Sequence, residues 1–137
     1  MSTSYLSVVR RIEENVEFLA ERVRSLKEEK YLHDNLAGLL RGVVRRRVGG
    51  NAYEEVEVDV LAGDVGIEVK VNPKFYEGVG QALAYRIYGL TPILVHFVDY
   101  TGSRYLNSLR ELSRDLPINV LVIDRLERRV TFKRVIE

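Results

Sequence analysis

The sequence predicts a single domain of the α/β class over residues 1–137, with helices packed on a mixed β-sheet. Two observations carry this prediction. Apolar residues recur at helical spacing within residues 5–40, whereas several later segments are short runs rich in valine and isoleucine, as is typical of strands. The two kinds of pattern then alternate along the chain, and such alternation is typical of helices that cover a sheet.

An amphipathic helix is expected within residues 1–27. Apolar residues from Tyr5 to Leu26 alternate at spacings of four and three, without Gly or Pro, and so form a heptad seam. This seam offers a surface for a homodimer. Alternatively, it packs on the chain's own sheet or on a second helical stretch that carries Leu32 to Leu40. The pattern fits one bent helix or two separate helices over residues 4–40.

The remaining elements are expected in the order strand, strand, strand, helix, strand, helix, strand, strand. Two of the strands are nearly continuous apolar runs, which predicts that they are buried on both faces. The expected bounds are Val43–Val48, Glu55–Leu61, Val65–Val71, a helix over Phe75–Tyr88, Pro92–Val98, a helix capped by Ser103, Ile118–Ile123 and Arg129–Val135.

Composition excludes several kinds of chemistry. The chain has no cysteine, which excludes disulfides, thiolate metal sites and cysteine nucleophiles. No apolar run approaches the roughly 20 residues that cross a bilayer, and the N-terminus lacks the layout of a secretory signal, so we expect a cytoplasmic protein. The net charge of +1 gives no argument for nucleic acid, although arginines gather at Arg41–Val48 and Arg125–Val135. The high charge content and single glutamine are typical of a thermophilic source.

Charged residues interrupt the strand pair that should form the centre of the sheet. If Gly63-Asp64 is a two-residue turn of type II′, Asp59 lies directly opposite Glu68, and Glu57 lies opposite Lys70. Because side chains alternate along a strand, these four share one face of the hairpin.

Opposed carboxylates at this register repel each other across about 5 Å. The pairing of Asp59 with Glu68 is therefore favourable only when a cation lies between them, and a hard divalent ion such as Mg²⁺ prefers such ligands. The Lys70 ammonium could then hold a phosphate oxygen or lower the pKa of an attacking water. The alternative is a surface ion pair between Glu57 and Lys70, with the other two carboxylates in solvent.

The order and spacing of these residues resemble a known signature. Asp59 followed by Glu68-Val69-Lys70 resembles the D…ExK motif of the PD-(D/E)XK nuclease superfamily. Gln81 and Tyr85 fall on the next expected helix, as the QxxxY motif does in the RecB-like branch of that superfamily. The sequence departs from the pattern at Val58, where the superfamily's proline would stand, a position that carries no chemistry.

The resemblance implies a fold and an activity. The fold is a restriction-endonuclease-like αβββαβ core with a mixed central sheet over residues 28–98. A helical extension precedes this core, and an αββ addition over residues 99–137 follows it. The implied activity is Mg²⁺-dependent hydrolysis of phosphodiester bonds in DNA, with Mn²⁺ able to substitute. A function of a different class, a non-catalytic nucleic-acid-binding or assembly module on the same fold, stays open.

The resemblance also implies roles for individual residues. Lys70 would orient or activate the attacking water, while Gln81 and Tyr85 would position the nucleic-acid strand. Further contacts to the nucleic-acid backbone are expected from Arg45, Arg47, Lys74 and Arg86. The implied metal ligands are Asp59, Glu68, the Val69 carbonyl, and an acid from the first helix of the core, either Glu29 or Glu28.

Both histidines are expected outside this site. His33 and its neighbour Asp34 point in different directions on a helix, which argues against a shared ligand role. His96 lies within an apolar run and is expected to be a hydrogen-bonded core residue.

Overall fold

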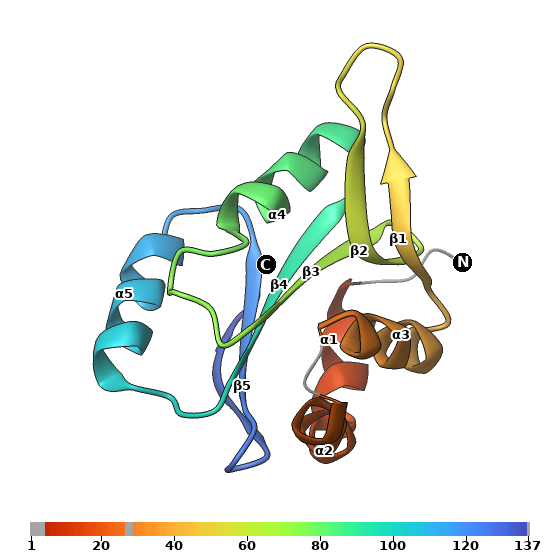
Figure 1. Cartoon of the computed structure of the whole chain (residues 1–137). Coiled ribbons are helices and arrows are strands. Elements are labelled where there is room, and N and C mark those ends of the chain that lie inside the picture. Colours follow the sequence, from red (N-terminus) through yellow and green to blue (C-terminus); the bar gives the residue numbers. More distant parts are fainter. Residues whose placement is uncertain (1–4, 27–28, 137) are drawn as a thin grey trace.

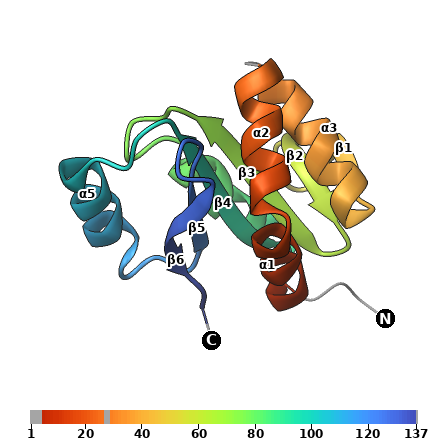
Figure 2. The same ribbon diagram turned by 90° about the horizontal axis from the view of Figure 1, so that it is seen from below.

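The computed structural model describes residues 5–26 and 29–136, which form a six-stranded mixed sheet with helices on both faces (Figures 1 and 2). The α/β class predicted from the sequence is confirmed. No helix within the described ranges is long and apolar enough to span a bilayer. The helices are α1 (Tyr5–Glu14), α2 (Val16–Leu26), α3 (Glu29–Leu40), α4 (Val79–Tyr85) and α5 (Ser103–Ser113).

The strands lie in the sheet in the order in which they occur in the chain. Neighbours are antiparallel from β1 to β3, parallel from β3 to β5, and antiparallel again at β6. The parallel steps are made possible by α4 and α5, which cross over the sheet between the paired strands. The strands are β1 (Val43–Val48), β2 (Val56–Ala62), β3 (Val65–Val71), β4 (Thr91–Val98), β5 (Asn119–Asp124) and β6 (Arg129–Arg134).

Helices α1, α2 and α3 cover one face of the sheet, where the seam residues with described side chains pack into the core. The helix breaks at Asn15, so the described residues 5–26 and 29–40 form three helices, where the sequence predicted one bent helix or two. Val9, Ile12 and Leu19 are buried in one core cluster with residues of α3 and of the sheet. The seam therefore packs within the chain, on α3 and on β5 and β6, and both expected intramolecular alternatives are observed. A homodimer through the seam would have to displace that packing, and the oligomeric state stays a prediction.

Helices α4 and α5 cover the other face, as Figure 1 shows. Leu94 and Val98 of β4 and Val120 of β5 pack there against Ala82 and Leu109. The alternate residues of the same two strands face α1–α3, which confirms that β4 and β5 are buried on both sides.

Two helix starts differ from the sequence-based expectation. Helix α4 begins at Val79 and not at Phe75, because Gly78 adopts φ +84°, a left-handed conformation that does not continue a helix. Helix α5 begins with Ser103 itself, and its N-cap is Gly102, without a side-chain cap. The Ser103 capping prediction was therefore wrong.

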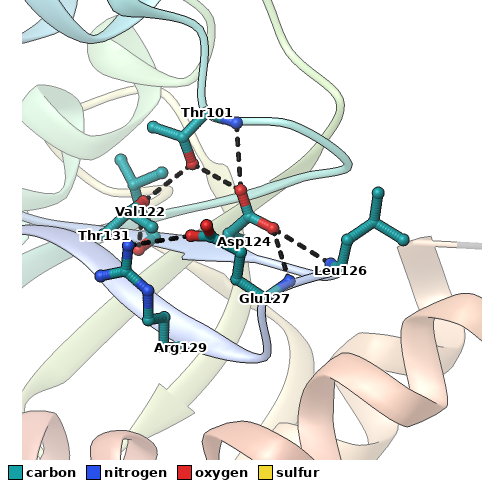
Figure 3. A network of polar contacts seen from close by, with 7 residues as sticks. All are labelled: Thr101, Val122, Asp124, Leu126, Glu127, Arg129 and Thr131. Atoms are coloured by element: carbon teal, nitrogen blue, oxygen red, sulfur yellow. Dashed lines mark hydrogen bonds and ion pairs between the residues drawn. The ribbon is translucent and has the colours of Figure 1, made fainter.

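A buried acid at the end of β5 ties two loops together (Figure 3). Asp124 Oδ1 accepts hydrogen bonds from the backbone N–H groups of Leu126 and Glu127, at 3.1 and 2.8 Å. Its Oδ2 accepts from the N–H and hydroxyl of Thr101, at 3.1 and 2.9 Å. Both oxygens are thus occupied by donors of the chain, so Asp124 fixes the loops that follow β4 and β5 and leaves no lone pair directed at a ligand.

The packing of α1 yields the first prediction. Ile12 is fully buried, whereas Leu6 on the same helix is half-exposed. Ile12→Glu should lower the free energy of unfolding by about 3–5 kcal/mol, because the new carboxylate has no partner in the core. Leu6→Glu is the matched control and should change it by less than about 1 kcal/mol. Denaturant titration measures both, and an Ile12→Glu protein as stable as the wild type would contradict the observed packing.

Candidate metal centre

The hairpin of β2 and β3 has the register that the sequence predicts. Gly63 carries the positive φ of +62° that a type II′ turn requires, and Ala62 pairs with Val65. Backbone pairing continues to Val60 and Ile67 and stops there, one residue short of Asp59 and Glu68. The two acids therefore lie opposite each other at the point where the strands stop pairing.

The side chain of Asp59 occupies that break in the pairing. Its Oδ2 accepts a hydrogen bond of 2.8 Å from the backbone N–H of Val69. The Asp59 side chain is only 15% exposed and that of Glu68 only 5%. Lys70 Nζ lies 3.5 Å from Glu68 Oε2. The alternative in which both acids extend into solvent is therefore wrong.

Helix α3 brings two further ligand groups to Asp59, and no short distance joins either of them to Glu68 among the described residues. Glu29 and His33 are four residues apart and so lie on one side of the helix. His33 Nε2 is 3.8 Å from Glu29 Oε1 and 3.5 Å from Asp59 Oδ2. One ligand atom from each of the three residues lies within 4.8 Å of the other two, which is close enough for the three residues to hold a metal ion. The alternative acid Glu28 lies outside the described residues.

His33 is the residue that sequence reasoning missed. As expected, Asp34 points elsewhere, and its Oδ1 lies 3.3 Å from Arg45 Nη2. His33, however, is buried on the side of α3 that faces the sheet, and neither of its ring nitrogens has a hydrogen-bond partner among the described residues. The spacing of four between Glu29 and His33 was the available signal. A buried imidazole near two carboxylates and without a hydrogen bond could serve as a metal ligand.

Tyr85 reaches the site from α4, on the opposite face of the sheet. Its hydroxyl donates a hydrogen bond to Glu68 Oε1, and its side chain is almost fully buried. Gly66 allows this position, because a Cβ at Gly66 would lie 2.8 Å from Tyr85 Cδ2. Gln81, one turn earlier on α4, is exposed. Of the two residues expected to position nucleic acid, only Gln81 therefore faces outward, whereas the Tyr85 hydroxyl holds a carboxylate.

Burial and like charge perturb both acids. Burial, together with the charge of Asp59, raises the pKa of Glu68 from its ordinary value to about 7, although Tyr85 and Lys70 oppose the change. Burial also raises the pKa of Asp59, against the hydrogen bond from Val69. Such an opposed pair retains a proton near neutral pH when no cation is bound. A divalent ion would take the place of that proton.

The predicted basic contacts lie around the site and not in it. Arg45 pairs with Asp34, and Arg47 pairs with Glu55 at 3.0 Å, both near the surface on edge strand β1. The other two predicted contacts are exposed, and in the chain Lys74 precedes α4 while Arg86 follows it.

His96 is the core residue that the sequence predicts. Its Nδ1 lies 2.7 Å from the Tyr105 hydroxyl, and its Nε2 lies 2.8 Å from the Glu77 carbonyl. With both ring nitrogens occupied, His96 contrasts with His33, and only the latter is available as a ligand.

Known proteins give no independent guide to this site. The chain matches no protein-family model, no curated protein and no solved structure. The chemistry of the site has therefore to be inferred from its own residues and from the motifs that they form.

The raised pKa of Glu68 yields a prediction about stability without metal. Because the folded-state pKa of about 7 exceeds the ordinary value of 4.5, the folded protein binds more protons than the unfolded chain between these pH values. The contribution of Glu68 to stability should therefore be fully present below pH 4.5 and be lost, by on the order of 3 kcal/mol, as the pH rises to 7.

Denaturant titrations in EDTA between pH 5 and 8 measure this fall. Glu68→Gln should flatten the pH dependence, whereas Glu57→Gln, an exposed acid on the same hairpin, should leave it unchanged. An equally steep pH dependence in the Glu68→Gln protein would show that another group causes it.

Proposed function

We propose that the chain is a metal-dependent nuclease of the PD-(D/E)XK type, which hydrolyses phosphodiester bonds in DNA. One observation carries the proposal: Asp59 and Glu68, two nearly buried acids, lie opposite each other, with Lys70 beside Glu68 and His33 Nε2 at 3.5 Å from Asp59. A structural role would not require two acids to be desolvated together, whereas a cation-dependent reaction does.

The arrangement of the elements supports the resemblance found in the sequence. Between α3 and β4 the chain runs helix, three strands, helix, strand, which is the αβββαβ order that the resemblance implies. The D…ExK residues fall on β2 and β3, and the QxxxY residues fall on α4. We therefore assign the restriction-endonuclease-like core to residues 29–98 as part of this proposal.

The donor set fits a divalent ion. Asp59, Glu68 and Glu29 offer the carboxylate oxygens that Mg²⁺ prefers, and the Val69 carbonyl stays a predicted fourth ligand. An imidazole such as His33 favours Mn²⁺ over Mg²⁺. The set as a whole therefore supports Mg²⁺ as a cofactor and Mn²⁺ as one that binds more tightly.

Each residue of the site would have a separate role in the proposed hydrolysis. A bound ion would polarise the phosphate and lower the pKa of a water bound to it. The Lys70 ammonium is partly exposed, so it can donate to a phosphate oxygen or to the attacking water while Glu68 fixes its position. Tyr85 holds the other oxygen of Glu68 and so fixes the orientation of that carboxylate. The arrangement excludes bulk water from the acids and leaves the ammonium accessible to substrate.

Two substitutions test the proposal by separating ion binding from turnover. Asp59→Asn should lose both ion affinity and cleavage, because it removes a ligand charge. Lys70→Ala should keep ion affinity and lose cleavage by roughly 10²–10⁴-fold, the contribution of a positioned acid–base group. Lys133→Ala, an exposed lysine on the opposite edge strand β6, is the control and should cleave DNA at the wild-type rate within a few fold.

Cleavage of labelled single-stranded and duplex DNA with Mg²⁺ or Mn²⁺ measures turnover, and titration calorimetry measures ion binding. A wild-type protein that binds the ion and DNA but cleaves no substrate would favour the alternative of a non-catalytic nucleic-acid-binding module.

A further inference from the structure

A hollow of about 470 Å³ lies beside the metal centre, between β2 and α4. Its volume falls in the range of small-molecule sites. Most of the residues that line it are small or apolar, and two of them, Gly80 and Ala84, belong to α4. The lining residues are Val56, Glu57, Gly80, Gln81, Ala84 and Tyr85.

The hollow and the metal centre share Tyr85. The hydroxyl of this residue holds Glu68, and the same side chain forms part of the wall of the hollow. Glu57, at another part of the wall, is two residues from Asp59 on β2. A phosphate at the acids and a group in the hollow would therefore be neighbours in one bound molecule.

The lining indicates which part of a nucleotide would enter. The Glu57 carboxylate disfavours a second phosphate, so the occupant carries no negative charge. The apolar wall favours a flat ring, and the exposed Gln81 amide can both donate to and accept from the edge of such a ring. A nucleobase has this combination of an apolar face and a polar edge.

We infer that the hollow receives one unpaired nucleobase next to the scissile phosphate, an assignment that rests on the proposed nuclease function. A base inside a duplex is stacked and paired, so it must leave the stack to enter such a hollow, at a cost in free energy. Single strands and frayed ends avoid this cost. The preferred substrate is therefore single-stranded or unpaired DNA, and not an intact duplex.

Gly80 provides a sharp test of this assignment. A Cβ at Gly80 would meet nothing within 4 Å, so a larger side chain there extends into the hollow without a clash in the protein. Gly80→Leu should fill the hollow and also favour the helix. Gly38→Leu is the matched control, because Gly38 also lies on a helix, has nothing within 4 Å of its Cβ position, and does not line the hollow.

The binding experiment compares two single strands of equal length and charge, one of adenine nucleotides and one of abasic nucleotides. Anisotropy is measured with Mg²⁺ in the Lys70→Ala background, so that cleavage is slow. The adenine strand should bind roughly tenfold or more tightly than the abasic strand. Gly80→Leu should abolish this difference, and Gly38→Leu should retain it. In parallel, wild-type protein should cleave a single strand at least about tenfold faster than a duplex of the same sequence.

The outcomes separate this inference from the proposed function. Equal affinity for both strands from a protein that cleaves DNA would overturn the base assignment and leave the nuclease proposal in place. A base preference that depends on Gly80, without cleavage of any substrate, would support the hollow as a base site and overturn the nuclease proposal. A duplex cleaved as fast as a single strand would overturn the substrate class inferred here.

Discussion

The opposition of Asp59 and Glu68 is the constraint on which the rest of the site depends. Backbone pairing of β2 and β3 stops just before these residues, and the Asp59 carboxylate takes a backbone N–H of β3 as its partner. Both acids are removed from water, and burial raises the pKa of each. Desolvating two like charges together is costly unless a proton or a cation neutralises them. The local structure therefore requires a neutralising partner for the two acids, either a proton or a cation, whatever the activity of the chain.

The two-sided sheet explains how other groups reach these acids. Helix α3 covers one face and brings Glu29 and His33, whereas α4 covers the other face and brings Tyr85 (Figure 1). The sheet itself is held by cores on both faces, so the strands that carry the acids are fixed while the helices supply ligands and hydrogen bonds. Contributions from several elements around one rigid sheet give the precision that ion binding requires.

The sequence predicted most of the strands and the hairpin register, because turn residues and alternation determine both. The pairing of Lys70 with Glu68, the role of His33 and the bond between Tyr85 and Glu68 were not predicted. Each depends on how an element packs, and local spacing does not contain that information. The predicted start of α4 was wrong for a related reason. Apolar residues before Gly78 continue the helical pattern, but the left-handed conformation of Gly78 prevents the helix from starting before Val79.

Crystals soaked in Mn²⁺ test the central claim most directly, through the anomalous scattering of the ion. The account predicts one strong anomalous peak among Asp59, Glu68 and His33, and loss of this peak in the Asp59→Asn protein. Its coordination distances should be close to those of oxygen and imidazole ligands. Well-diffracting crystals with no peak at these residues, or with an equal peak in the variant, would contradict the claim that the opposed acids form a cation site.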